Sequence, residues 1–209
     1  MGGMLRAGEI RSTRARCGIG ALGLFSVNRD TLTASNNREA IPMSRIKIEW
    51  YQELLRRSRD ETLKTAKGVP ESRRLVQLRE GKAHPLWLLG HLANTMNVVC
   101  LQWVLEKESL TPRGFGKRFA PDFGGGAPIT ANAGDYPAWD EVAAIYDQVL
   151  SAAIDGVAAL NDEDLPLPLR GRIPDPLREF FKSNDFTLTQ MVIHDSYHRG
   201  QMGLLGKLG

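Results

Sequence analysis

Histidine spacing near the carboxyl end of the chain is the feature that most directly suggests chemistry. His194 and His198 are four residues apart, and in a helix this spacing places two side chains on one face, one turn apart. Two imidazoles in that arrangement can bind a single metal ion. The chain contains only four histidines, and a third, His91, lies within another helical segment. The sequence therefore predicts a three-histidine metal site formed by His91, His194 and His198.

Histidine pairs also occur on solvated helix faces or as hydrogen-bonded core residues, and these are the alternatives. The face of the pair also holds Met191, Gln201 and Leu205, which indicates that it is partly buried. Three buried imidazoles without a metal would need polar partners that the flanking Leu, Val and Ala residues cannot supply. We therefore favour a divalent ion as the cofactor. Imidazole suits several such ions, so Zn, Ni, Fe and Mn stay open.

The metallopeptidase motif His-Glu-x-x-His is a second interpretation of the same spacing. Asp195 stands where that motif has Glu, and it is one methylene shorter. No His, Asp or Glu follows His198 to supply a further ligand. A peptidase is therefore disfavoured. We interpret Asp195 as a surface residue or as support for a metal ligand, while a role as a base stays open.

Other reactive or aromatic side chains are interpreted as structural. His84 lies two turns before His91, about 10 Å along a helix axis, so we expect it to cap the helix or line the pocket mouth. Cys100 is expected in the core. Trp87 is expected to pack, with walling of the pocket as the alternative. Tyr197 is expected to pack on a neighbouring helix.

Four segments with helical periodicity must position these side chains. The first starts at Ser44 as N-cap and ends at Gly68; the second starts at Pro85 and is apolar nearly all round; the third starts at Asp135 as cap; the last starts at Thr187 or Thr189. Gly90 in the second segment would let a neighbour approach closely. No segment alternates as a strand would. The expected fold is an all-α four-helix bundle with long crossover loops.

The connector over 107–134 is rich in Gly and Pro, and connectors of this length are usually lids, binding loops or disordered segments. We interpret it as the lid of a metal-dependent enzyme. Arg113, Lys117 and Arg118 lie in it and would be suited to an anionic substrate. Solvated loop charges are the alternative, which we favour.

The first 42 residues differ in composition from the rest. Residues 1–42 hold six Arg and three acidic residues, whereas residues 43–209 balance 21 basic against 21 acidic residues. The apolar run over 17–27 is too short to span a bilayer. We interpret 1–42 as a disordered or mis-assigned N-terminal extension upstream of a start near Met43, with targeting as the minority alternative. Residues 43–209 are expected to form one domain.

Composition also narrows the partners and the compartment. The charge balance of the folded part predicts no nucleic-acid interface. No segment predicts a membrane span. The two cysteines, Cys17 and Cys100, cannot make a disulfide framework, and this favours a reducing, cytoplasmic location.

Two motifs taken together resemble the DinB-like superfamily. They are Trp87-Leu88-Leu89-Gly90-His91-Leu92-Ala93 and His194-Asp195-x-Tyr197-His198-x-Gly200-Gln201. The resemblance covers about residues 44–209. It implies a four-helix bundle of the up-down-down-up type, with a divalent metal held by three histidines. On this resemblance, His91, His194 and His198 occupy the ligand positions.

The resemblance and the predicted site leave three functions open. Relatives of this family include transferases and isomerases that use low-molecular-weight thiols, but the resemblance of this chain extends only to the fold and the metal site. The first hypothesis is a metal-dependent thiol S-transferase acting on a small-molecule substrate, in which the ion would generate a thiolate. A metal-dependent hydrolase is the second hypothesis. The third is a non-catalytic, metal-stabilised bundle serving stress response or dimerisation, and a homodimer is the candidate assembly.

Overall fold

The computed structural model describes residues 45–121 and 124–208, and every regular element within these ranges is helical. This confirms the prediction of an all-α fold. The predicted extension over 1–42 and the predicted cap Ser44 lie outside the described residues. The longest helices are α1 (Ile46–Lys67), α2 (Pro85–Thr95) with its continuation η3 (Met96–Val104), α4 (Trp139–Val157) and α6 (Asn184–Leu205). The shorter elements are η2 (Glu71–Arg73), α3 (Phe115–Phe119), η5 (Ala133–Asp135), η6 (Asp162–Asp164) and α5 (Asp175–Arg178).

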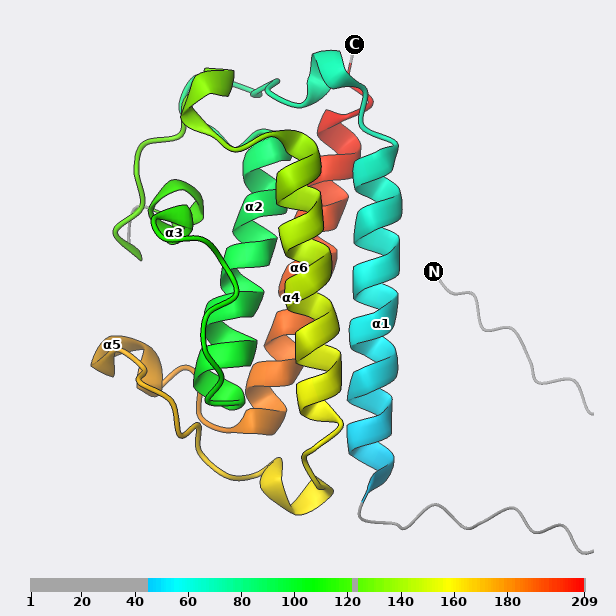
Figure 1. Ribbon diagram of the computed structural model, residues 1–209, viewed down its shortest axis with the longest axis vertical. Helices are drawn as coiled ribbons and strands as arrows, with labels where there is room; N and C mark the ends of the chain where they lie inside the picture. The colour runs from blue at the N-terminus through cyan, green and yellow to red at the C-terminus, as the bar shows by residue number, and fades with distance from the viewer. Residues whose placement is uncertain (1–44, 122–123, 209) are drawn as a thin grey trace, which may run out of the picture. The chain divides into compact units, whose positions relative to one another are not determined.

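The long helices pack as a ring around one core. α1 packs against α4 and α6, and α2 packs against the same two helices. Figure 1 shows α1 and α6 running in one direction and α2 and α4 in the other, which is an up-down-down-up arrangement. Because α2 and α4 are parallel, the chain has to return along the bundle between them. The long connector between these two helices makes that return.

α2 is the most buried helix, as its nearly all-apolar sequence predicts. Residues 85–94 are all buried. Pro85 stands in the first turn, where its missing N–H removes no helical hydrogen bond. The side chain of His84 caps this end by accepting a hydrogen bond from the backbone N–H of Trp87. Beyond Thr95 the helix continues as the wider π-helix η3.

α4 begins at Trp139, so the prediction that Asp135 caps it is wrong. Pro137 is the physical reason, because proline disfavours helical backbone in the residue before it. Tyr136 is accordingly extended, with φ −128° and ψ 155°. The Asp135 carboxylate accepts a hydrogen bond from the Thr130 hydroxyl at 2.6 Å instead.

α6 begins earlier than predicted, because its N-cap is Ser183 rather than Thr187 or Thr189. The Ser183 side chain accepts a hydrogen bond from the Phe186 N–H. The Thr187 hydroxyl donates to the Ser183 carbonyl oxygen at 2.7 Å, so it already lies inside the first turn. The added turn anchors the amino end of the helix that carries two of the predicted ligands.

The connector predicted as a lid contains a short helix of its own. α3 buries Phe115 and Phe119, and it packs on α2. Gly90 of α2 makes this approach possible, because a Cβ atom there would come within 2.3 Å of the Phe119 ring. The close approach expected at Gly90 is therefore made by α3.

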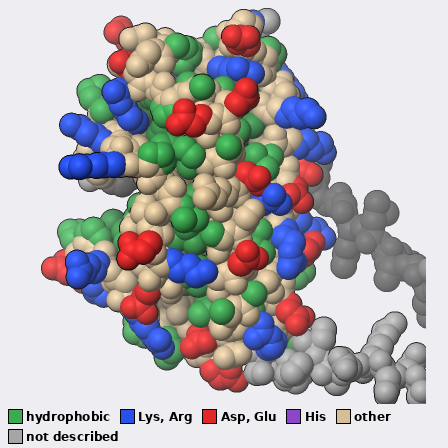
Figure 2. All heavy atoms as spheres, in the orientation of Figure 1, with side chains coloured by type: hydrophobic (Ala, Val, Ile, Leu, Met, Phe, Trp, Pro, Cys, Tyr) green, Lys and Arg blue, Asp and Glu red, His purple; other side chains and the backbone are tan. Residues whose placement is uncertain are grey.

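The surface in Figure 2 carries acidic and basic side chains interspersed with apolar ones. Charge on this face is therefore mixed and does not form a field of one sign. Within the two described ranges, no helix combines the length and the apolar character that crossing a membrane requires.

Candidate metal centre

Three histidines converge where α2 packs against α6. His91 comes from the middle of α2, while His194 and His198 come from α6. The centroid of the His91 ring lies 5.0 Å from that of His194 and 4.9 Å from that of His198, and the His194 and His198 centroids are 4.5 Å apart. One nitrogen atom of each ring lies within 4.8 Å of the other two. The structure thus brings together the residues that the sequence predicts as a metal site.

The His91 ring is oriented by groups from two elements. Its Nδ1–H donates to the carbonyl oxygen of Phe119 at 2.9 Å. Because a carbonyl oxygen only accepts, this bond leaves the lone pair on Nε2, which faces the other histidines. The Trp87 ring stacks on His91 at 4.7 Å and 9°, and its Nε1–H donates to the Arg118 carbonyl oxygen. Trp87 therefore forms a wall of the site, which was the alternative to the expected packing role.

The separation of two ring nitrogens tests whether a metal ion fits. The Nε2 atoms of His91 and His194 are 3.2 Å apart. Two imidazole nitrogens bound to one tetrahedral ion at about 2.0–2.1 Å are about 3.3 Å apart. The other ring nitrogen of His194, Nδ1, is buried without a hydrogen-bond partner among the described residues. The donor set and this separation therefore fit a divalent ion.

His198 is supported from its own helix. Its Nδ1 lies 2.7 Å from Oε1 of Gln201, and Nε2–H of Gln201 donates to the Tyr197 hydroxyl at 3.1 Å. The expected packing of Tyr197 on a neighbouring helix is wrong, because this side chain is 62% exposed. Gln201 was expected only to share the face of the histidine pair, although its three-residue spacing from His198 also indicates a contact between the two side chains.

Burial lowers the pKa of all three imidazoles. Loss of hydration is the largest cause, and it lowers the pKa of His91 to about 4 and that of His194 to about 3. The pKa of His198 is lowered by the same cause. Since a histidine has to be unprotonated to bind a metal, the three rings are available at neutral pH without losing a proton.

Two other side chains considered from the sequence lie outside this cluster. His84 accepts from the Trp87 N–H through Nδ1, and its Nε2–H donates to the Thr130 carbonyl oxygen, so it is a helix cap as expected. Cys100 is fully buried in the core, also as expected. Burial raises the pKa of its thiol to about 12, so the thiol is not ionised at neutral pH.

Asp195 is not a surface residue, and that interpretation is wrong. It is 0% exposed, and its carboxylate accepts hydrogen bonds from the hydroxyls of Thr62 at 2.8 Å and Tyr146 at 2.7 Å. One residue turns a helix by about 100°, so Asp195 faces α1 and α4 while its neighbour His194 faces α2. Burial raises the pKa of Asp195 to about 6. The carboxylate therefore joins three helices and does not point at the histidines.

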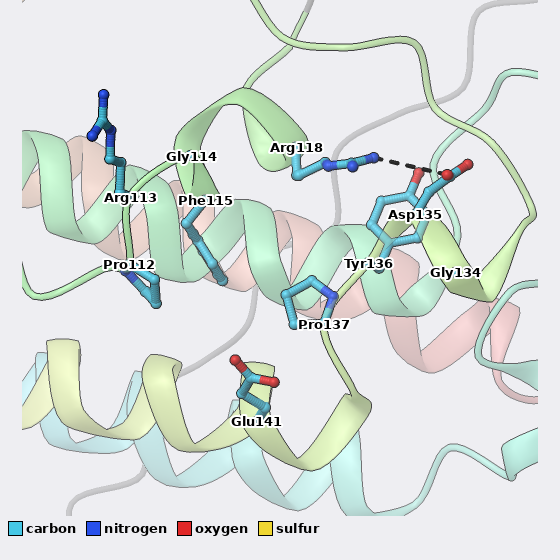
Figure 3. Close-up of a pocket in the computed structure, with 10 residues that line it drawn as sticks. All are labelled: Pro112, Arg113, Gly114, Phe115, Arg118, Gly134, Asp135, Tyr136, Pro137 and Glu141. Atoms are coloured by element: carbon cyan, nitrogen blue, oxygen red, sulfur yellow. Dashed lines mark ion pairs between the residues drawn. The ribbon is translucent and has the colours of Figure 1, made fainter.

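A separate pocket of about 340 Å³ lies between α3 and the start of α4 (Figure 3). Arg113 and Arg118 line it, whereas Lys117 is exposed and does not. Arg118 forms a 3.9 Å ion pair with Asp135, drawn as the dashed line in Figure 3, and Arg113 points away from that pair. The basic residues of the connector are thus exposed or paired, in agreement with the interpretation as loop charges.

The chain was compared with known protein families and with curated proteins. A family model described as the DinB superfamily matches residues 54–202, a span that runs from α1 into the last turn of α6 and includes all three histidines. No curated protein matches the chain. Because the match covers well over half of the chain, and the chain is all-helical as that resemblance implies, this protein belongs to the DinB superfamily.

Proposed function

We propose that this protein binds one divalent metal ion through His91, His194 and His198. The observation that carries the proposal is the 3.2 Å separation of the His91 and His194 Nε2 atoms. The lone pair of His91 lies on that atom, because its Nδ1–H is already bonded to a carbonyl oxygen. Poorly hydrated nitrogens that converge in this way are satisfied together by a shared cation.

The donor set narrows the identity of the ion. Mg²⁺ and Ca²⁺ prefer oxygen ligands, whereas imidazole nitrogen suits first-row transition ions. The proposed cofactor is therefore Zn, Ni, Fe or Mn. Three neutral ligands leave the charge of the ion uncompensated, which favours an anionic group of the substrate beside it.

We further propose a transferase that acts on a small-molecule thiol. A divalent ion at this position would lower the pKa of a thiol or a water molecule that binds it. Within residues 45–121 and 124–208 no thiol lies at the site, because Cys100 is buried in the core with a raised thiol pKa. The proposed nucleophile is therefore a thiol that arrives with the substrate.

A hydrolase is the second candidate, and the geometry favours it less. Hydrolysis would benefit from a carboxylate base beside the metal. The described cluster consists of three histidines without a carboxylate, and Asp195 is held by Thr62 and Tyr146. A non-catalytic bundle, a homodimer and a cytoplasmic location stay predictions.

Metal stoichiometry tests the proposed site. Protein purified without an affinity tag is loaded with zinc, nickel or manganese, desalted and analysed for bound metal. We expect about one ion per chain in the wild type, on the basis of a single three-ligand site, and none in His91→Ala. His84→Asn is the matched control, because it replaces another buried histidine with a residue that still caps a helix. A metal-free wild type, or equal metal loss in His84→Asn, would contradict the proposal.

The transferase reaction is tested separately. Loaded protein is incubated with a low-molecular-weight thiol and an electrophile, and thioether formation is followed. We expect turnover that requires both the thiol and the metal and that disappears in His91→Ala. Ester cleavage without thiol dependence would favour the hydrolase instead.

A further inference from the structure

The three histidines are supported in three different ways, and only the support of His198 can reverse. His91 donates to a backbone carbonyl oxygen, which always accepts. His194 Nδ1 has no partner among the described residues. His198 Nδ1 faces the side-chain amide of Gln201 at 2.7 Å. Because an amide carries an acceptor on one side and a donor on the other, its orientation decides which nitrogen of His198 holds the proton.

Gln201 is held at its other end by Tyr197. Its Nε2–H donates to the Tyr197 hydroxyl at 3.1 Å, and the Tyr197 ring lies 5.0 Å from the His198 ring. With Oε1 facing His198, the proton is on Nδ1 and the lone pair is on Nε2. If the amide turned over, its NH₂ group would donate to Nδ1, and the proton on Nε2 would block metal binding.

We propose that Gln201 is a positioning residue that selects the metal-binding tautomer of His198. Tyr197 steadies the amide, and its hydroxyl accepts from the amide in the orientation observed. This tautomer matters for function only if the proposed metal site exists. The tautomer itself is a property of the metal-free protein, so it is measured without any metal.

Ring ¹⁵N chemical shifts report the tautomer of each histidine directly. In metal-free protein at neutral pH we expect His198 to be protonated on Nδ1 in the wild type. Gln201→Glu should keep this state, because a carboxylate only accepts. Gln201→Leu should shift the ring toward protonation on Nε2, the form that neutral imidazole prefers in water. An unchanged His198 tautomer in Gln201→Leu overturns the proposal.

Metal affinity is the second readout, measured for zinc by competition with a chromophoric chelator. Gln201→Leu should weaken binding about 10–100-fold, the usual loss when the partner of a ligating histidine is removed, and Gln201→Glu should bind at least as tightly as the wild type. Gln148→Leu, which changes an exposed glutamine of α4, is the control and should have no effect. In a His198→Ala background, Gln201→Leu should cause no further loss of zinc affinity.

The two readouts separate failure of this proposal from failure of the metal site. If the wild type binds no zinc, the proposed function fails, and the ¹⁵N shifts still decide the role of Gln201. If the wild type binds zinc and Gln201→Leu stays within about threefold of it, the positioning role is overturned. The positioning role is also overturned if Gln201→Leu weakens zinc binding as much in the His198→Ala background as in the wild type.

Discussion

Two polar clusters share α6, one buried and one partly buried, and they differ in how completely their atoms are hydrogen-bonded. The acidic cluster consists of Asp195, Thr62 and Tyr146, in which both carboxylate oxygens accept hydrogen bonds from hydroxyl groups. Arg199 adds an ion pair at 3.5 Å to the same carboxylate. Buried polar groups in folded proteins normally find such partners. The acidic cluster is thus complete within the protein, which indicates a structural role.

The histidine cluster, His91, His194 and His198, is incomplete by the same standard. Its ring nitrogens converge, and one buried nitrogen of His194 has no partner among the described residues. A partly buried cluster with an unpartnered buried nitrogen indicates a place where something else binds. The completeness of hydrogen bonding, and not burial or charge alone, therefore distinguishes a structural cluster from a candidate binding site.

The largest expected loss of stability is that caused by removing the Asp195 carboxylate. Asp195→Ala removes the carboxylate that accepts from the buried Thr62 and Tyr146 hydroxyls, and Tyr146 keeps a 3.4 Å contact with the Ser58 carbonyl oxygen. We expect the free energy of unfolding to fall by about 2–4 kcal/mol. Urea unfolding of metal-free protein measures it. Bound metal per folded chain should stay as in the wild type. Loss of metal with unchanged stability would show that the acidic cluster belongs to the site.

A smaller loss is expected where α3 meets the histidine cluster. Gly90→Ala would place a Cβ atom within 2.3 Å of the Phe119 ring, and overpacking of this kind costs about 1–3 kcal/mol. Because the Phe119 carbonyl oxygen holds His91, zinc affinity should fall as well. Thermal unfolding and chelator competition test the two effects.

Gly200→Ala is the matched control for Gly90→Ala. Gly200 also lies within a helix, but a Cβ atom there would meet nothing within 4 Å. We expect it to raise the free energy of unfolding by about 0.5–1 kcal/mol, because alanine favours helix over glycine. If both variants lost the same free energy of unfolding, the close approach of α3 to α2 at Gly90 would be contradicted.

The two clusters should change the free energy of unfolding of metal-free protein in opposite directions as the pH is lowered. The pKa of His91 is lowered from 6.5 to about 4, so the unfolded chain takes up a proton first, and stability falls as pH drops from 6.5 toward 4. The pKa of Asp195 is raised from 3.8 to about 6, so its contribution is present below pH 3.8 and is lost as pH rises toward 6.

Unfolding free energies at pH 7, 6 and 5 separate these contributions. Each group changes the slope by at most about 1.4 kcal/mol per pH unit. Asp195→Asn removes the opposing term, so its stability should fall more steeply with acid than that of the wild type. Parallel curves for the two proteins would show that Asp195 does not titrate as its burial indicates.

The smallest effect is expected at the unpaired nitrogen itself. His194→Leu removes a buried ring nitrogen that lacks a partner, so metal-free stability should stay within about 1 kcal/mol of the wild type or rise. Metal binding should be lost at the same time. A large destabilisation, as expected for Asp195→Ala, would mean that the 3.2 Å contact between the Nε2 atoms of His194 and His91 stabilises the metal-free protein.

Much of this arrangement was predictable from local patterns in the sequence. The period of apolar residues predicts the helical class, and Pro85 and Gly68 mark helix boundaries that the structure confirms. The spacing of His194 and His198 predicts that their side chains share a face. Each of these features depends on residues within a turn or two of one another, so the sequence carries it without knowledge of the fold.

Contacts between distant segments were decided only by the tertiary structure. The acceptor for His91 is a carbonyl oxygen 28 residues away, on a short helix that periodicity did not reveal. Asp195 was misplaced for a related reason, because a single charged residue in a helix gives no sign that hydroxyl groups from two other helices will meet it. Helical spacing sets the direction of a side chain, whereas its partners depend on which segments the packing brings alongside.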